Sequence, residues 1–214
     1  MRYRRHILLT AALLLQSSHF VFAADEVRYG FVLHAPFFSN EARVPNLLDP
    51  HVFVADPATA EAVGPQGITH AAGFRPALMV DDPAQMIFSA KGKQLGITLR
   101  QWFSAYGSYV GTRQNDGSEK IVATFAALIP NGHYSLFENH FAPAGVTFTP
   151  LDDKGIGNNF VAGTDGTATL TLTAPANLTH DNAVLLIYHS DGRDHGIERG
   201  AIGDTVHHQL ISRP

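Results

Sequence analysis

The stretch AVLLIYHSDGRDHGIERGAIGDTVHHQL, residues 183–210, joins the clearest buried strand of the chain to its most polar loop. Residues 184–188 form a continuous apolar run, which predicts a strand covered on both faces. The run leads into a loop rich in His, Asp and Gly, and the stretch ends shortly after a His-His pair. Because rigid strands commonly present functional side chains on the loops that follow them, we expect the functional site in this stretch.

The rest of the chain shows further strand patterns. Residues 108–113 and 120–128 flank Asn115-Asp116-Gly117, which is a strong signal for a hairpin turn. Residues 167–173 alternate Thr with Ala or Leu, which predicts an antiparallel strand with one face in water. Short strands separated by turn signals, without βαβ alternation, are typical of a β-sandwich. The sequence therefore predicts an all-β fold, an antiparallel β-sandwich of the immunoglobulin or fibronectin type.

One short helix is predicted at the start of this sandwich. Thr98 can cap residues 99–105, where apolar side chains recur on one face. We expect Trp102, the sole Trp of the chain, to fill one end of the core rather than stack on a ligand. One or two further helical turns are predicted at residues 56–64, which begin with Asp-Pro and end with Gly.

The N-terminus has the pattern of a secretory signal peptide, residues 1–23. Three arginines precede an apolar run, and small residues lead to a cleavage point after Ala23. The run is shorter than the roughly 20 residues that a membrane span needs. We therefore expect a soluble, exported protein, periplasmic or extracellular. Residues 24–95 are predicted as an N-terminal extension that packs on the sandwich, and residues 96–214 as the β-sandwich domain.

Composition narrows the classes of function. Removal of the signal peptide takes three of the 15 basic residues and none of the 19 acidic ones, so the mature chain has 12 basic and 19 acidic residues. An acidic chain without a basic cluster is a poor partner for nucleic acid. The absence of Cys excludes disulfides, thiol catalysis and iron–sulfur clusters. Ten of the 12 His lie in the mature chain, and this enrichment indicates metal binding or a response to pH.

Two motifs carry a resemblance to a known group of proteins. They are Leu128-Ile129-Pro130-Asn131-Gly132-x-Tyr134 and Tyr188-His189-x-Asp191-Gly192-x-x-His195-Gly196. Together they resemble a group of uncharacterised exported β-sandwich domains from bacteria and archaea, over roughly residues 95–210. The resemblance implies an exported all-β domain and supplies no activity, cofactor or catalytic residue. In fibronectin-type and immunoglobulin-like sandwiches, a Tyr placed like Tyr134 holds a loop in place through a hydrogen bond of its hydroxyl.

The His-rich stretch suggests a site for a divalent metal, copper or zinc. His189 ends the apolar strand, while Asp191 and His195 lie in the loop behind it. Neutral imidazoles with a carboxylate suit Zn²⁺ or Cu²⁺. Because adjacent strand residues face opposite ways, only one of His207 and His208 can join such a site. The predicted ligands are His189, Asp191, His195 and His208.

Two other interpretations stay open at this point. His189 and His195 can instead be hydrogen-bonded anchors of a loop, since Asp-Gly and His-Gly pairs are common in turns. The protein would then be a metal-independent module that recognises a ligand or a partner protein of unknown kind. An enzyme has the least support, because Ser190 lacks the surrounding G-x-S-x-G pattern and sequence neighbours do not make a triad.

Overall fold

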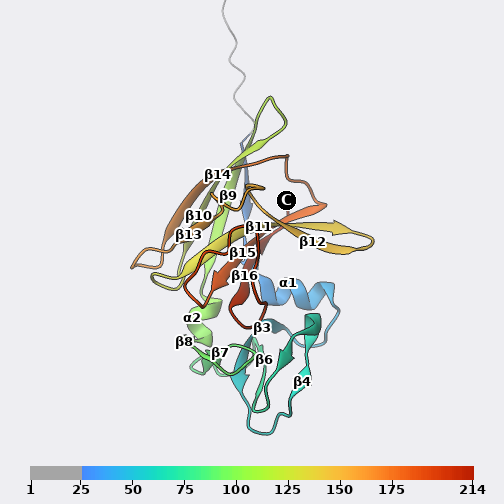
Figure 1. The fold of residues 1–214 in the computed structure, drawn as a ribbon, viewed down its shortest axis with the longest axis vertical. Helices are drawn as coiled ribbons and strands as arrows, with labels where there is room; N and C mark the ends of the chain where they lie inside the picture. Colours follow the sequence, from blue (N-terminus) through green and yellow to red (C-terminus); the bar gives the residue numbers. More distant parts are fainter. Residues whose placement is uncertain (1–25) are drawn as a thin grey trace, which may run out of the picture.

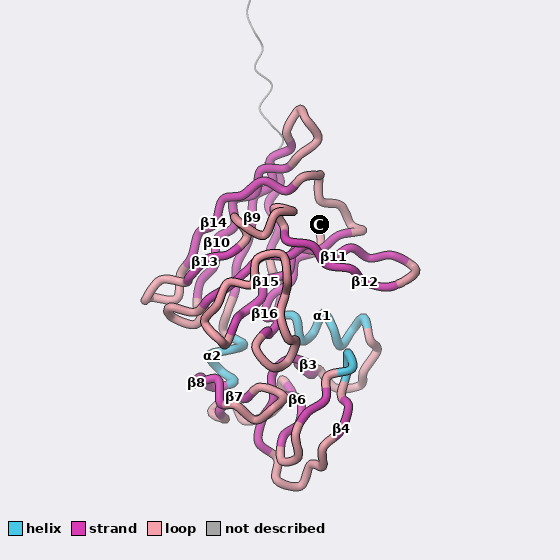
Figure 2. The backbone as a smooth tube through the Cα atoms, in the orientation of Figure 1, coloured by secondary structure: helices cyan, strands magenta, loops and turns pink. Residues whose placement is uncertain are grey.

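The computed structural model describes residues 26–214, and the predicted signal peptide lies outside them. Antiparallel strands and loops make up almost all of this part of the chain, with helix confined to short segments (Figures 1 and 2). The predicted all-β, sandwich-like fold is confirmed. Within residues 26–214, no helix combines the length and the apolar character needed to cross a membrane.

The first sheet of the sandwich has the order β1-β9-β10-β14. Its strands are β1 (Glu26–Gly30), β9 (Tyr106–Arg113), β10 (Glu119–Ala126) and β14 (Ala168–Ala174). The predicted turn at residues 115–117 joins β9 to β10: Asp116 accepts a hydrogen bond from the Ser118 amide, and Gly117 has a φ of 86°. The threonines of β14 are exposed while Leu172 is buried, as the alternating pattern predicts.

The second sheet has the order β12-β11-β15-β16-β2, with β13 also paired to β11. Its strands are β2 (Val32–Leu33), β11 (His133–Ala142), β12 (Gly145–Pro150), β13 (Asn159–Val161), β15 (Asn182–His189) and β16 (Val206–Ser212). Residues 184–188 of β15 are buried on both faces, as predicted. Leu186 packs into the core between the sheets, whereas Leu185 and Ile187 belong to a separate apolar cluster on the outer face.

The predicted helix is α2 (Leu99–Phe103), and its capping box explains where it begins. The Thr98 hydroxyl accepts from the Gln101 amide, and the Gln101 side chain accepts from the Thr98 amide. Trp102 is fully buried in the core. Tyr134 also behaves as predicted, because its hydroxyl accepts a hydrogen bond of 3.0 Å from the Ile129 amide and ties the preceding loop.

Most of the predicted N-terminal extension forms a smaller layer below the sandwich in Figure 1. Its elements are α1 (His34–Glu41), β3 (Leu48–Ala55), β4 (Ala62–Val63), the 3₁₀ turn η1 (Pro65–Gly67), β5 (Thr69–His70), β6 (Phe74–Leu78), β7 (Met86–Phe88) and β8 (Gln94–Thr98). One sheet runs β6-β3-β7-β8, and β4 pairs with β5. Both α1 and β3 contact β16. The first strands of the extension, β1 and β2, lie in the two sandwich sheets instead.

Two local expectations differ from the structure. The helical turns predicted at residues 56–64 are wrong: a turn and the short strand β4 occupy this segment. Tertiary pairing decides this, because the Asp56 amide bonds to the Gly73 carbonyl and the Asp56 carboxylate binds Arg75. The second difference is α1, because no helix is predicted at residues 34–41 from the sequence.

Irregular pairing in two strands decides which side chains reach the outer face of the second sheet. In β16 the register shifts so that Leu210 pairs with Leu186 while His208 pairs with Ile187, which leaves Gln209 as an extra residue. In β3 the register shifts between Asp49 and Phe53. Bulges of this kind re-aim side chains and are common beside functional sites. The bulge in β16 turns His208 outward, toward α1 and β3.

Candidate metal centre

Three buried histidines from separate elements meet on the outer face of the second sheet. His34 begins α1, His51 lies in the irregular part of β3, and His208 lies on β16. Each offers a ring nitrogen, and these nitrogens lie within 4.8 Å of one another. Their exposed fractions are 4%, 0% and 2%. We call His34, His51 and His208 the tris-histidine cluster.

Two of the three ring pairs in the tris-histidine cluster meet at steep angles, and the third pair, His34 with His51, is inclined by 31° with centroids 5.1 Å apart. His34 and His208 lie edge to face, with centroids 5.1 Å apart and planes at 89°. His51 and His208 have centroids 4.0 Å apart and planes at 70°. Imidazole lone pairs lie in the ring plane, so rings inclined in this way can direct nitrogens toward a common point.

Burial keeps these imidazoles neutral. It lowers the pKa of His34 to about 3. Burial also lowers the pKa values of His51 and His208 well below the usual 6.5, and a neighbouring ring adds to the effect in each case, His34 for His51 and His51 for His208. The neutral form is the one that binds a metal ion, because it has a free lone pair.

Hydrogen bonds around His51 fix its tautomer. Its Nδ1 accepts from the backbone amide of His208 at 2.9 Å. The proton of the neutral ring must therefore lie on Nε2, which donates to Gln66 Oε1 at 2.5 Å. His34 Nδ1, in contrast, is buried and has no hydrogen-bond partner among residues 26–214. His34 thus has an uncommitted nitrogen, while both nitrogens of His51 are engaged: its Nε2 can bind a metal only if the ring proton moves to Nδ1 and both of these hydrogen bonds are given up.

A buried polar network supports His51 from behind. The Asp49 carboxylate accepts from the His51 amide at 2.8 Å and from Trp102 Nε1 at 2.8 Å. Burial raises the pKa of Asp49 to about 6, although these hydrogen bonds act in the opposite direction. His207 Nδ1 donates to the His51 carbonyl at 2.7 Å, and its Nε2 lies 3.1 Å from Ser190 Oγ. His207 Nδ1 therefore donates to a backbone carbonyl, whereas in a catalytic triad the same nitrogen would donate to a carboxylate.

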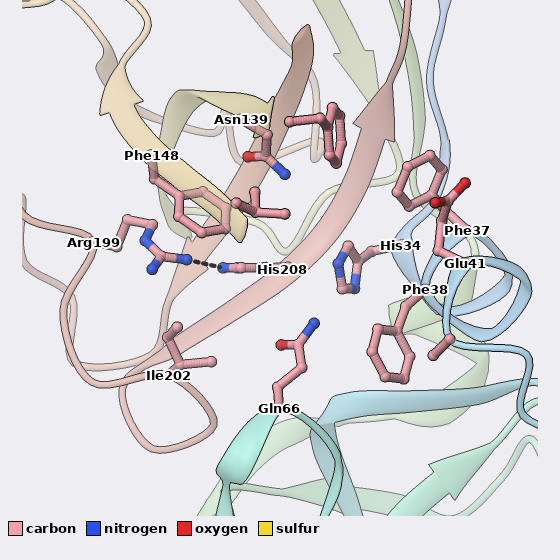
Figure 3. A pocket seen from close by; sticks show the side chains of 13 residues that line it. His34, Phe37, Phe38, Glu41, Gln66, Asn139, Phe148, Arg199, Ile202 and His208 are labelled. Atoms are coloured by element: carbon pink, nitrogen blue, oxygen red, sulfur yellow. Dashed lines mark hydrogen bonds between the residues drawn. The ribbon is translucent and has the colours of Figure 1, made fainter. Parts of the chain in front are cut away.

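The tris-histidine cluster borders a pocket of about 490 Å³ (Figure 3). His34 and His208 line it, together with Gln66 and Arg199. The Arg199 guanidinium lies over the Phe148 ring, 3.4 Å from its centroid, and Nη1 is 3.4 Å from His208 Nε2. Burial lowers the pKa of Arg199 to about 10, so it stays charged at neutral pH.

The structure divides the four predicted ligands between two sites. His189, Asp191 and His195 do come together, with one donor atom each within 4.8 Å. His208 belongs to the tris-histidine cluster, with His34 and His51, and not to this group. The single site of His189, Asp191, His195 and His208 is therefore corrected to two groups, because the bulge in β16 turns His208 toward α1 and β3.

The group of His189, Asp191 and His195 has the features of a loop anchor. His195 Nε2 lies 3.1 Å from an Asp191 oxygen, and His189 Nε2 lies 2.7 Å from Ser135 Oγ. The two imidazole rings stack at 4.8 Å and only 19°. Nearly parallel rings direct their lone pairs side by side, so at least one ring must turn before both can bind one ion. His189 Nδ1 is nevertheless buried and unpartnered among the described residues, and burial lowers the pKa of His189 to about 4.

His34 and His51 are the site residues that the sequence analysis missed. Their distance in sequence from His208 hides the cluster, because neither lies in a recognisable ligand spacing with it. The enrichment of His in the chain is the one signal in the sequence that points to them. One chain segment links both groups: the loop between β15 and β16 carries Asp191 and His195 to one group and Arg199 to the pocket of the other.

No family model matches this chain, and neither a curated protein nor a solved structure matches it. The resemblance to exported β-sandwich domains therefore stays a prediction. The geometry of the two histidine groups is what supports a function.

Proposed function

We propose that this protein is an exported metal-binding protein that holds one zinc or copper ion with His34, His51 and His208. The observation that carries the proposal is the meeting of three neutral, buried imidazoles from three separate elements. Burial of polar rings is costly unless their nitrogens gain partners, and one of these rings has a nitrogen without any among residues 26–214. A metal ion would supply that partner.

The donor set limits the choice of metal. Three imidazole nitrogens without a carboxylate suit Zn²⁺ or Cu²⁺ and disfavour Mg²⁺ and Ca²⁺, which prefer oxygen ligands. Three protein ligands also leave a coordination position free, and two of the three histidines line the pocket. The proposed centre is thus open to a small molecule from the pocket side.

Arg199 affects this centre by its charge. It lies beside His208 and opposes a second positive charge nearby. A negatively charged group in the pocket would offset both charges, so we expect the metal to bind more tightly in the presence of an anion. Metal binding at His51 Nε2 would also move the ring proton to Nδ1 and would replace the hydrogen bonds to Gln66 and to the His208 amide.

Metal titration of the mature chain, stripped with EDTA, tests the proposal. We expect one Zn²⁺ or Cu²⁺ per chain by calorimetry, and a loss of at least 10-fold in affinity for His34→Gln and His208→Gln. His195→Gln and the exposed His180→Gln are the controls and should retain the affinity. Loss of the metal in His195→Gln with full retention in His208→Gln would move the site to the other histidine group.

A second function, recognition of a small molecule without any metal, is favoured by one observation. The pocket holds a cation and several aromatic side chains, whether or not a metal lies beside it. Failure of the metal titration would leave this function as the leading one.

A further inference from the structure

The pocket beside the tris-histidine cluster is shaped for a ligand with an apolar body. Its volume of about 490 Å³ falls in the range of small-molecule sites. Phe37 and Phe38 come from α1, Phe141 from β11 and Phe148 from β12, while Ile202 comes from the loop before β16. Figure 3 shows Phe38 and Phe148 on opposite sides of the His34 and His208 rings. Aromatic side chains on several sides are typical of a site for a flat, apolar group.

Arg199 adds one positive charge to this apolar pocket. It is half-buried, and no carboxylate within residues 26–214 forms an ion pair with it. Its plane lies on the Phe148 ring, which orients the guanidinium; Nη1 faces His208 Nε2 at 3.4 Å, and the other NH groups along the edge are available to donate. A guanidinium is the side chain best suited to bind a carboxylate through two parallel hydrogen bonds.

The remaining polar groups of the pocket support the same interpretation. Asn139 is 5% exposed, and its Oδ1 has no partner among the described residues; the same holds for His34 Nδ1. Buried polar atoms without partners are rare in folded proteins, so they indicate a missing ligand or water. Glu41, the only carboxylate that lines the pocket, lies 3.8 Å from Arg213, away from Arg199.

We propose that this pocket binds a small aromatic monocarboxylate, with its carboxylate on Arg199 and its ring among Phe38, Phe141 and Phe148. The pocket offers one cation, Arg199, which can pair with one carboxylate of the ligand. The negative charge of Glu41 disfavours a ligand that carries two carboxylates. The proposal goes beyond the metal centre and does not require it. With a metal on the tris-histidine cluster, the same carboxylate would also lie close to the free coordination position.

The test uses 3-phenylpropanoate and its neutral analogue of the same shape, 3-phenylpropanamide, with the full mature chain. Binding is measured by calorimetry in two samples, one treated with EDTA and one loaded with Zn²⁺. We expect the acid to bind both samples at least 10-fold more tightly than the amide. Arg199→Met should remove this preference, and Arg199→Lys should keep part of it, because it retains the charge but not the paired donors.

Arg193→Met is the matched control. Arg193 lies in the same loop between β15 and β16 as Arg199, but it is exposed and does not line the pocket. This variant should bind the acid like the parent. Thermal unfolding of each variant establishes that it is folded.

Equal affinity for acid and amide, or unchanged preference in Arg199→Met, would overturn the proposal. Failure to bind a metal at the tris-histidine cluster would be a separate result. Acid binding that depends on Arg199 in the EDTA-treated sample would uphold the pocket even if no metal binds. Acid binding that requires Zn²⁺ and ignores Arg199 would uphold the metal and reject the role of Arg199.

Discussion

Acidification should destabilise this protein at a pH where most of its carboxylates are still charged. The cause is the set of buried histidines that stay neutral in the folded state. The pKa of His34 is lowered to about 3, and the pKa values of His189 and His207 are lowered to about 4, by burial. In the unfolded chain each of these rings has a pKa near 6.5. Below that pH the unfolded state binds protons that the folded state does not. The free energy of unfolding therefore decreases as the pH is lowered.

The size of the effect follows from these pKa values. Between pH 6.5 and 4.5 each of the three histidines costs about 2.2 kcal/mol, roughly 7 kcal/mol together, because the unfolded ring is only half protonated at pH 6.5. Asp49 acts in the opposite direction: its pKa is raised to about 6, so its protonation returns roughly 2 kcal/mol over this range. The net loss is about 5 kcal/mol. Even half of that is a large part of the roughly 5–15 kcal/mol by which proteins are stable.

Urea unfolding between pH 7.5 and 4.5 measures this loss. Trp102 is the sole Trp and is fully buried, so its fluorescence reports the transition. Samples contain EDTA, because a bound metal would compete with protons. Below pH 6, His34→Gln should reduce the number of protons taken up on unfolding by about one, which makes the free energy of unfolding less dependent on pH. The exposed His180→Gln should leave this dependence unchanged. A free energy of unfolding that stays constant from pH 7 to 4.5 would refute the assignment of neutral, buried histidines.

Three other outcomes are expected. Trp102→Phe removes the donor to the buried Asp49 carboxylate and should lower the free energy of unfolding by about 2 kcal/mol or more; a loss below 0.5 kcal/mol in urea unfolding would contradict this. Tyr134→Phe leaves the Ile129 amide without its acceptor and should cost about 1 kcal/mol, with hydrogen exchange at that amide faster than in the parent; unchanged exchange would argue against the tie. Zn²⁺ at 100 times its dissociation constant should stabilise the protein by about 2.7 kcal/mol in thermal unfolding; an unchanged unfolding midpoint at that concentration would contradict a site that exists only in the folded state.

The parts of the fold that the sequence predicts are those encoded by local patterns. Residues 184–188, the alternating strand β14 and the turn at residues 115–117 each depend on neighbours in sequence. The helix α2 is predicted for the same reason, because its capping box lies within four residues. Helix α1 is different: it contains Pro36 near its start and Ser39 and Asn40 near its end, which resemble the end of a strand. Packing against β3 and β16 accounts for its helical form.

The site is predicted only in part, because contacts between distant segments create it. His208 is a predicted ligand, yet the bulge at Gln209 decides its direction and therefore its partners. His51 is placed by an irregular stretch of β3 that no periodicity reveals. His189, Asp191 and His195 do meet as predicted, because they are close in sequence and connected by one tight loop.

A zinc-loaded crystal, measured at the zinc absorption edge, tests the proposed metal centre most directly. The anomalous difference map should show one strong peak among His34, His51 and His208, with ring nitrogens about 2.0–2.1 Å away. The Gln66 side chain should have moved away from His51 Nε2 in that crystal, since the metal replaces its hydrogen bond. A peak among His189, Asp191 and His195 instead, or no peak at either group, would contradict the assignment of the tris-histidine cluster as the metal centre.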